Sequence, residues 1–443
     1  MITKPHLTLL PLTCAIYLVV SGGPYGIEDA VGRAGPRLTL LLCLLVPITL
    51  SLPTALMAAE LTALLPVEGG FYFWVKEALG PFAAFVEAYL TVLYTAVDTA
   101  IYPVLFVTYC ASLFPMSSAA QVGLAISAVW LCGFLNAMGV RLVGRTSMLL
   151  TAGAIAPFVA LVALGLQRLF HWHLPPEVPS HNLIRRLGGA LVVVIWNFCG
   201  WENLSVVSAE IDNPQQNYVR ALAITLPAVT LGYLLPLAVS LQGAAPSSWY
   251  TGAFAQQAVA IGGRLLGTAV VIGAAFSSLA MFDAAMLWVS RLPLVLAREN
   301  YLPASLAAVS SREVPILALV ICCCIFTLLI PLGFLTLVAI GVFFYMLALA
   351  LEMMALIRLR RIYPERRGLF RIGGGRVAVY LVAMTPLCTW FASLGMDVSS
   401  HAKDLIVAAG LAVSVGPVYA LLRSRYGGPT KSCEGPIRSF LRS

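Results

Sequence analysis

Charged residues are scarce in this sequence. Lysine, arginine, aspartate and glutamate make up 10% of its 443 residues, whereas soluble globular chains carry about 25%. Hydrophobic residues account for 60%, and the mean hydropathy is +0.92. A water-soluble fold of this length has too small an interior to bury so much apolar surface. The composition therefore excludes a soluble globular protein and predicts that lipid surrounds most of the chain.

The sequence also lacks the motifs of several other protein classes. No basic run carries interleaved aromatic residues, so no nucleic-acid partner is expected despite the net charge of +8. The motifs HExxH and GxSxG are absent and all five histidines fall near span ends or in loops, so neither an enzyme nor a cofactor is expected. The ten cysteines show no paired spacing, and we interpret them as buried or lipid-facing small hydrophobic side chains.

Two further absences concern the first apolar stretch and a histidine-containing loop. The first stretch is followed by glycine and proline at 21–26 and not by a small-residue cleavage site, so we expect no cleavable signal peptide. The proline-rich segment 174–180 lies near His171, His173 and His181. No ligand spacing there supports a metal site, so none is expected.

Apolar runs long enough to cross a bilayer recur along the whole chain. A spanning helix needs about 20 mostly apolar residues. The first, sixth and eighth of these runs carry glycine, proline or acids in their middles. We predict an all-α integral membrane protein with about 12 transmembrane helices, at residues 7–31, 37–64, 81–113, 119–138, 144–167, 187–211, 220–242, 264–297, 314–332, 334–358, 376–396 and 403–422.

The basic residues predict how these spans are oriented. With both termini in the cytoplasm, the inner loops and tails hold about 20 of the 27 lysines and arginines, as is typical of cytoplasmic loops. We therefore expect a multi-pass protein of the plasma (inner) membrane. The basic loop 358–376 and the tail after Arg423 are interpreted as anchors of this topology that also favour anionic lipid.

Two spans are predicted to be broken. Residues 21–26, Ser-Gly-Gly-Pro-Tyr-Gly, combine three glycines with a proline, which removes a helical donor and clashes with the preceding turn. The sixth span has a milder counterpart at 197–203, Asn-Phe-Cys-Gly-Trp-Glu-Asn. Irregular backbone in a membrane is tolerated where it lines a cavity or is buried in protein. Interrupted spans in matching places of two halves predict the binding site of a secondary transporter.

Acidic residues occupy the middles of several spans. Asp98 in the third span and Asp283 in the eighth fall in equivalent places of the two halves, and Tyr94 and Tyr102 share a helix face with Asp98. With Glu28, Asp29 and Glu202 they make five acids without a basic partner at the centre of their spans. Each costs about 2.5–3.5 kcal/mol at a helix centre when charged.

That cost leaves three outcomes for the acids: a proton, hydrogen bonds from unwound backbone amides, or a transported cation. We expect a carboxyl group among Glu28, Asp98, Glu202 and Asp283 to be protonated in part of a transport cycle. Three other acids, Glu60, Glu87 and Glu352, lie nearer the cytoplasmic side, with Lys76 and Arg358 close in sequence. We interpret these three as local salt-bridge or gate residues.

Five segments succeed one another along the chain in a recognisable order. They are SGGPYGIEDAVGRAGP at 21–36, AELTALLPVEGGFYFWVKEALGP at 59–81, DTAIYPVLF at 98–106, WNFCGWENLSVVSAEIDNPQQNYVRAL at 196–222 and LARENYLPASLA at 296–307. In this order they resemble segments of the amino acid–polyamine–organocation transporter superfamily, in particular its polyamine-uptake and L-type amino acid transporter branches. The resemblance covers most of the chain to about residue 310.

The resemblance implies a LeuT-like fold with two inverted five-helix repeats and two additional helices. The repeats would occupy 1–170 and 171–360, and the extra helices with a basic cytoplasmic tail 361–443. It also implies that the substrate binds at the two breaks and that transport is commonly coupled to protons. Trp201 resembles the aromatic lid of the sixth span, and Glu202 takes the place of an acid typical of the polyamine branch.

The sequence departs from the family pattern at two places. The eighth-span acid of the polyamine branch falls on Ala285 here, with Asp283 two residues earlier. Many proton-coupled members carry a lysine in the fifth span, where this chain has only Arg145 at the cytoplasmic end. Thr146, Ser147 and Thr151 do not make a clear sodium site, so coupling should rely on a carboxyl group.

These observations predict a secondary active transporter of a small amine-bearing solute, a polyamine or an amino acid, coupled to protons and working by alternating access. A neutral amino acid permease or exchanger is the alternative within the class, and a non-transporting receptor or scaffold is the alternative outside it. Asp98 and Glu202 are predicted as counter-charges to an amine, flanked by Tyr102 and Trp201. The expected substrate-binding residues are Ser21, Gly22, Gly23, Gly26, Glu28, Asp29, Tyr94, Asp98, Tyr102, Trp201, Glu202 and Asp283.

Overall fold

The computed structural model describes residues 7–67, 69–138, 145–170, 183–242, 249–298, 300–310, 314–365, 368–397 and 402–427. These ranges are folded into helices, and an isolated parallel bridge pairs Leu7 with Ile211. The helices of the first half are α1 (Leu9–Val20), α2 (Glu28–Ala34), α3 (Pro36–Val46), η1 (Pro47–Ser51), α4 (Leu52–Leu64), α5 (Gly70–Leu79), α6 (Pro81–Leu113), α7 (Ser118–Ala137) and α8 (Arg145–Phe170).

The second half repeats the alternation of long and broken helices. Its elements are α9 (Leu183–Asn197), η2 (Asn203–Glu210), α10 (Pro214–Ser240), α11 (Ala253–Val289), α12 (Arg291–Arg298), η4 (Ala304–Ala307), α13 (Ile316–Leu329), η5 (Ile330–Leu332), α14 (Phe334–Ile362), α15 (Gly375–Asp397), α16 (Ala402–Val413) and α17 (Val415–Tyr426).

Nine helical segments among the described residues are long and apolar enough to cross a membrane. Of the twelve predicted spans, the first, sixth and ninth do not qualify by length. The first and sixth are broken, and the ninth is shortened to Ile316–Leu332. The nine are Pro36–Leu64, Pro81–Leu113, Ser118–Ala137, Ala152–Phe170, Pro214–Ser240, Ala253–Arg298, Phe334–Ile362, Gly375–Met396 and Ala402–Tyr426.

Large apolar side chains are exposed on the outer helices. Leu265 is 85% exposed and Leu328 is 77% exposed. Water would penalise so much exposed apolar surface, whereas lipid accommodates it. The all-α membrane fold predicted from composition is therefore confirmed. Other exposed examples are Leu131 and Phe134 of α7, Leu381 and Phe391 of α15, and Ile406 and Val407 of α16.

Some boundaries differ from those predicted. The eighth span was placed from residue 264, but α11 already begins at Ala253 and is kinked where Gly262 and Gly263 leave helical angles. The predicted start thus coincides with the kink. The twelfth span is divided into α16 and α17 at Ser414, and α5 is a short helix between the second and third spans.

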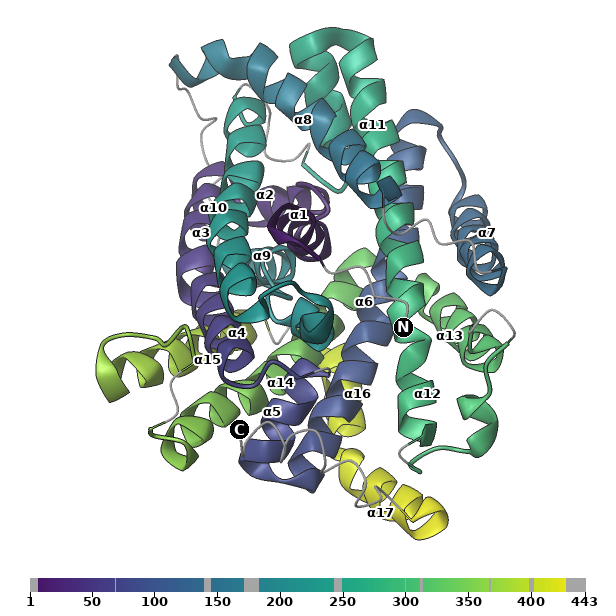
Figure 1. The fold of residues 1–443 in the computed structure, drawn as a ribbon. Coiled ribbons are helices and arrows are strands. Elements are labelled where there is room, and N and C mark those ends of the chain that lie inside the picture. Colours follow the sequence, from purple (N-terminus) through teal and green to yellow (C-terminus); the bar gives the residue numbers. More distant parts are fainter. Residues whose placement is uncertain are drawn as a thin grey trace.

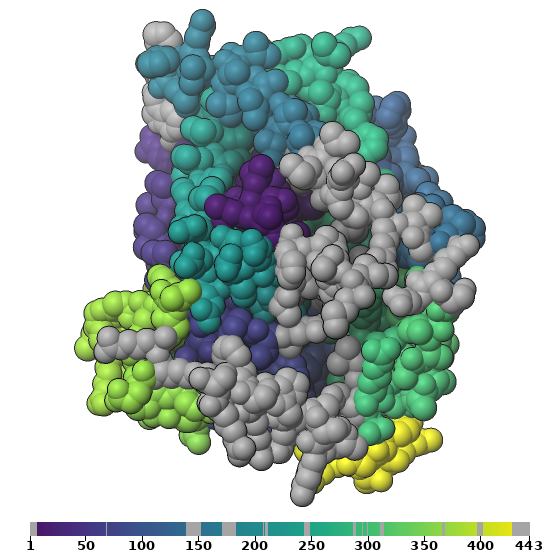
Figure 2. All heavy atoms as spheres, in the orientation of Figure 1, coloured from purple at the N-terminus to yellow at the C-terminus, as the bar shows by residue number. Residues whose placement is uncertain are grey.

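A central group of helices surrounds the two breaks. Helix α6 packs most extensively against α14 and α11, and α1 packs against α10 and α8. In Figure 1, α1 is seen nearly end-on in the middle of the molecule, with α7 and α13 together at one edge and α15 towards the other. In Figure 2 the purple start of the chain reaches the surface between the segments of α8 and α10.

The first span is broken where glycine and proline predicted it. α1 ends at Val20, α2 begins at Glu28, and Gly22, Gly23 and Gly26 between them have positive φ angles of 59°, 114° and 84°. A side chain on Gly22 would also collide with the sulfur of Met281, at 2.1 Å from an added Cβ. Only glycine fits this turn of the chain.

The sixth span is broken too, but the segment after its break is a 3₁₀ helix and not an α-helix. α9 ends at Asn197, Gly200 has a φ of 89°, and residues 203–210 form the 3₁₀ helix η2. The π-helical turn η1 of the second span lies against this break, and the Ser51 hydroxyl donates to the Phe198 carbonyl at 2.9 Å. A π turn of this kind often marks a functional site.

The two ends of the bundle are named by their side chains. The end that holds Glu60, Arg360 and Arg371 is called the basic end. The end that holds Glu28 and Thr251 is called the opposite end. Helix α6 connects them, because Glu77, just before its first residue, accepts from Tyr363 near Arg360, and Tyr109, near its last residue, donates to Glu28.

Candidate functional site

A cavity of about 80 Å³ lies between the two breaks. The first break contributes Ser21 and Gly22 to its lining, and the second contributes Cys199 and Asn203. Helices α1, α6, α9, α10 and α11 contribute most of the remaining wall. The two interruptions predicted from glycine and proline therefore meet at one cavity, which is what the transporter interpretation requires.

Side chains from distant helices satisfy the freed backbone groups of the first break. The Ser277 hydroxyl of α11 donates to the Gly22 carbonyl, and the Tyr233 hydroxyl of α10 donates to the Ser21 carbonyl at 3.5 Å. The Ser21 hydroxyl itself accepts from the Gly23 amide at 3.2 Å. The break is therefore held in place by the surrounding bundle, as buried polar backbone in a membrane must be.

The second break is held in the same manner. The Tyr345 hydroxyl of α14 accepts from the Gly200 amide at 3.0 Å, and the Tyr218 hydroxyl of α10 donates to the Trp201 carbonyl at 3.0 Å. The Trp201 indole donates to the Phe198 carbonyl at 2.8 Å. The Trp201 ring is thus buried in the scaffold of the break, at 1% exposure, and does not line the cavity.

Asp98 is the acidic side chain that faces the cavity. Its two oxygens accept from different elements, Oδ1 from the Trp196 indole at 2.8 Å and Oδ2 from the Tyr102 hydroxyl at 3.2 Å. Both partners are neutral, and none of the residues lining the cavity is lysine or arginine. A carboxylate in this setting keeps its negative charge uncompensated and attracts a cation.

The structure brings Trp196, and not the predicted Trp201, to the cavity wall. It lies five residues earlier, in the last turn of α9, and packs edge-on against Phe334 of α14 with ring centroids 5.5 Å apart. The sequence signal available was its position one residue before Asn197, at the start of the predicted break. The lid was assigned by resemblance to the family, which placed it on the other side of the break.

Glu202 lies beside the cavity and not in its lining. It is 3% exposed, and its Oε2 accepts from the Tyr345 hydroxyl at 3.0 Å. That hydroxyl also accepts from the Gly200 amide, so one tyrosine joins the acid to the break. The Tyr345 ring packs on Tyr94, a cavity-lining residue, with centroids 5.2 Å apart.

The two predicted acids of the first span form their hydrogen bonds at the opposite end of the bundle and do not line the cavity. Glu28 is fully buried and accepts from the Gly26 amide at 2.8 Å, from the Gly252 amide at 3.2 Å and from the Tyr109 hydroxyl. Asp29 accepts from the Thr251 hydroxyl. Together the two acids tie the second half of the first span to the segment just before α11.

Asp283 turns away from the cavity. Its Oδ1 accepts from the Asn136 amide of α7 at 2.7 Å, although its α11 neighbours Met281, Ala284 and Ala285 line the cavity wall. Asp98 and Asp283 were predicted as equivalent acids of the two halves. The structure gives them different neighbours, because Asn136 supplies a hydrogen-bond donor on the far side of α11.

Of the twelve predicted binding residues, the structure brings five to the cavity wall: Ser21, Gly22, Tyr94, Asp98 and Tyr102. It places the other seven around the cavity, in the breaks, in the tie at the opposite end or against α7. These seven are Gly23, Gly26, Glu28, Asp29, Trp201, Glu202 and Asp283.

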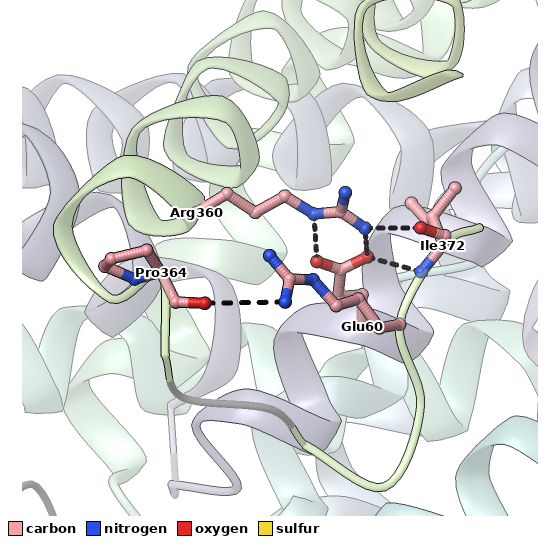
Figure 3. Close-up of polar contacts among 5 residues, drawn as sticks. Glu60, Arg360, Pro364 and Ile372 are labelled. Atoms are coloured by element: carbon pink, nitrogen blue, oxygen red, sulfur yellow. Dashed lines mark hydrogen bonds and ion pairs between the residues drawn. The ribbon is translucent and has the colours of Figure 1, made fainter. Parts of the chain in front are cut away.

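One of the three acids predicted to form salt bridges does so. The Arg360 guanidinium of α14 donates hydrogen bonds to both carboxylate oxygens of Glu60, and it also donates to the Ile372 carbonyl at 2.9 Å. Figure 3 shows this pair, with the Ile372 amide donating to Glu60 at 2.8 Å. The partner is Arg360 and neither of the bases near in sequence, Lys76 and Arg358.

For Glu87 and Glu352 the structure shows no salt bridge among the described residues, and their alternative interpretation as gate residues stays a prediction. Glu87 accepts from the Thr91 hydroxyl at 2.7 Å through Oε1, while its Oε2 has no hydrogen-bond partner. The Oε2 of Glu352 has none either. Proximity in sequence to a base misled the prediction, because both side chains turn into the bundle, where they are 0% and 3% exposed.

Several predictions fall on parts that the structure leaves undescribed. The histidine-containing loop at 171–182 and the tail beyond 427 lie outside the described residues, as do the side chains of Thr146, Ser147 and Thr151. Within the described residues no cluster of histidine, cysteine, aspartate or glutamate has the geometry of a metal site.

Comparisons with known proteins agree with this architecture. A family model described as amino acid permease matches residues 7–415. The polyamine transporter PUT1 of Oryza sativa subsp. japonica is 32% identical over 418 residues, 93% of this chain and 77% of its own. The polyamine transporter RMV1 of Arabidopsis thaliana is 31% identical, over 86% of this chain and 78% of its own. The Asc-type amino acid transporter 1 of Mus musculus is 27% identical over 60% of this chain and 53% of its own.

Proposed function

The chain belongs to the amino acid permease family, and from this premise we propose that it carries a cationic amine, a diamine or polyamine, across the membrane by alternating access. Its curated relatives include polyamine transporters, which supports an amine as the solute. A carrier accounts together for the broken spans, the cavity between them and the acid in its wall that has no basic partner there. A channel, an enzyme or a receptor requires none of these features in combination.

The observation that carries the proposal is the setting of Asp98. It faces the cavity between the two breaks, its two hydrogen-bond donors are neutral, and no lysine or arginine lines the wall. An ammonium group supplies the positive charge that this carboxylate lacks. The aromatic rings of Tyr94, Tyr102 and Trp196 surround the same space and contribute cation–π contacts of about 0.5–2 kcal/mol each.

The same proposal covers location and organisation. We place the protein in the plasma or inner membrane with its basic end and both termini in the cytoplasm, because cytoplasmic loops concentrate arginine and lysine. The division into repeats at 1–170 and 171–360, with 361–443 additional, belongs to this proposal. We also propose that the protein has no catalytic activity.

A proton is the coupling ion in this proposal. The lining of the cavity offers the carboxyl group of Asp98 and no lysine, so in this proposal the proton resides on an acid. Net movement of an amine against its gradient then depends on the pH difference across the membrane and not on sodium.

Competition for uptake into proteoliposomes tests the choice of solute. Putrescine, spermidine, lysine and leucine are compared as competitors for the wild type and for Asp98→Asn, which keeps the shape of the side chain and removes its charge. Binding of a diamine or polyamine should weaken at least about tenfold, or roughly 1.4 kcal/mol. Leucine should be affected less, because its single ammonium also rests on backbone carbonyls freed by the breaks.

Asp283→Asn is the matched control for that experiment. It removes the same charge at the equivalent place of the other half, where the carboxylate faces Asn136 and not the cavity. It should lower thermal stability and leave the preference order unchanged. If Asp98→Asn behaves like Asp283→Asn, or if the wild type prefers leucine to every amine, the protein is a neutral amino acid permease and the cationic proposal is wrong.

A further inference from the structure

We propose that Glu87 and Glu352 form a facing pair of buried carboxyl groups that holds the coupling proton of this transporter. The inference rests on the proposed function and names the residues that couple it to a proton gradient. Neither residue was among the acids that the sequence suggested for coupling. The pair lies between the central cavity and the ion pair of the basic end.

The facing arrangement results from how α6 and α14 pack. The ring of Tyr94 in α6 lies 5.2 Å from the ring of Tyr345 in α14, centroid to centroid, and a Cβ added at Gly341 of α14 would lie 3.7 Å from the Val97 side chain of α6. A residue later in α6 thus meets a residue earlier in α14, so the two helices run antiparallel. Seven residues before Tyr94 is Glu87, and seven residues after Tyr345 is Glu352. Two turns bring each back to the same face of its helix, so the two acids meet about 10 Å below the tyrosines.

The acids lack the partners that charged carboxylates need. Glu87 is 0% exposed and Glu352 is 3% exposed, and one oxygen of each, Oε2 in both cases, has no hydrogen-bond donor. Two carboxylates cannot both remain charged at such a site without a cation. A proton on either one removes a charge and supplies the missing donor, since a protonated carboxyl group has an O–H.

The surroundings provide no positive charge for the pair. The groups that interact with it electrostatically are Glu202 of the second break, Tyr218 of α10 and Tyr345 of α14. Basic side chains on the neighbouring helices are engaged elsewhere or exposed. Lys76 of α5 lies over the rings of Tyr72 and Phe73, Arg360 of α14 grips Glu60, and Arg358, Arg376 and Lys403 are exposed. The other acids nearby, Glu77 of α5 and Glu60 of α4, are bonded to Tyr363 and Arg360.

Glu202 connects the pair to the solute. It interacts with both Glu87 and Glu352, and it is bonded to Tyr345, whose ring packs on the cavity-lining Tyr94. On the other side, the Glu60–Arg360 pair lies eight residues further along α14, about 12 Å away. The proton thus enters from the cavity while the opposite end is open, and leaves when the Glu60–Arg360 contact opens and water reaches the pair.

A proton fits the pair better than an ammonium group of the solute. Neither Glu87 nor Glu352 lines the central cavity, and the Tyr94–Tyr345 layer separates them from it. A metal ion fits less well too, because no three acids, histidines or cysteines among the described residues come together closely enough to ligate one. If an ammonium group of the solute does reach the pair, the experiment described next detects it.

The test compares exchange with accumulation in proteoliposomes. Exchange and accumulation of radiolabelled putrescine are measured, with the membrane potential clamped, for the wild type, Glu87→Gln, Glu352→Gln and the double variant. Glutamine mimics a carboxyl group that never releases its proton. Because one pH unit is worth about a factor of ten in an equilibrium, the wild type should accumulate amine about tenfold per unit of imposed gradient. The double variant should reach an accumulation ratio of about one while still exchanging putrescine for putrescine.

Glu77→Gln is the matched control, since Glu77 lies near the same end of the bundle but bonds to Tyr363. It should keep the full response to pH. The inference is overturned if the double variant accumulates amine as the wild type does. It is also overturned if a folded variant loses both putrescine exchange and putrescine binding, because the pair would then be a subsite for the solute.

Uptake measured with the wild type distinguishes failure of this inference from failure of the proposed function. Amine uptake that ignores the pH gradient and tracks sodium overturns the proton pair and leaves amine transport standing. If the wild type carries leucine and no amine, the proposed solute is wrong, and the same comparison of exchange with accumulation is made with leucine. Coupling that survives in the double variant then overturns the pair.

Discussion

At both ends of the bundle carboxylates tie distant segments together, but with different partners. At the basic end the Glu60 carboxylate accepts hydrogen bonds from the Arg360 guanidinium and the Ile372 amide. At the opposite end Glu28 and Asp29 accept from hydroxyl groups and amides alone among the contacts described. The Glu60–Arg360 contact is neutral as a pair, whereas Glu28 has no basic partner among the described contacts and Asp29 has only a longer-range interaction with Arg33.

That difference has a functional consequence under the proposed transport cycle. A cationic solute arriving at the opposite end meets the Glu28 carboxylate, which has no basic partner among the described contacts, so its arrival favours loosening of the hydrogen bonds to Glu28. A solute at the basic end meets an ion pair that already satisfies both charges, so closure there depends less on the solute. The ends therefore differ in how strongly they respond to an amine.

The largest effect is expected from breaking the ion pair of the basic end. Arg360→Met leaves Glu60 charged and buried, and removal of one partner of a buried pair costs about 3–5 kcal/mol. The double variant Glu60→Met/Arg360→Met removes both charges and should recover most of that stability. Thermal unfolding of the purified protein measures both changes. Equal destabilisation by the single and the double variant would show that the pair contributes packing and not charge.

Sequence reasoning located the breaks because their cause is local. Three glycines and a proline in six residues dictate an irregular backbone wherever the chain is placed. It also found the acid of the cavity, since Asp98 lies in the middle of a long apolar helix. The 3₁₀ helix η2 after the second break was not predicted, because it depends on contacts with distant loops. The Gly69 amide, for example, donates to the Val206 carbonyl at 3.0 Å.

Partners of the acids were the part that sequence could not supply. Glu60 binds Arg360 across 300 positions of the chain, whereas the prediction looked to Lys76 and Arg358. Asp283 faces α7 because Asn136 offers a donor there, and nothing in the spacing of α11 indicates that side. A helix face can be read from periodicity, but the element packed against it is a property of the fold.

A smaller effect is expected from Glu28→Gln at the opposite end. The carboxylate accepts three hydrogen bonds, and the glutamine side chain cannot accept all of them because its NH₂ group only donates. Hydrogen bonds to a charged group contribute about 1.5–3 kcal/mol each, and partial loss should lower stability by about 2 kcal/mol. Hydrogen exchange of the amides at 249–252 should accelerate, while exchange at 368–372 should not.

Tyr109→Phe is the control for that variant, since it removes one donor and leaves the carboxylate in place. It should accelerate exchange at 249–252 to a lesser degree than Glu28→Gln. Equal exchange in both variants and in the wild type would mean that Glu28 does not hold this end closed, and the comparison of the two ends would fail.

The smallest effect is expected from Thr251→Val. The change removes the hydroxyl that donates to Asp29 and keeps the branched shape of the side chain. Asp29 is only half-buried and interacts electrostatically with Arg33, so water and that base replace part of the lost contact. The cost should stay below about 1.5 kcal/mol. Exchange of the Gly252 amide should rise only slightly, because its own bond to Glu28 remains. A loss as large as that of Glu28→Gln would make Asp29 the principal tie of the opposite end, with its charge compensated by Arg33, and the two ends would then be closed by the same chemistry.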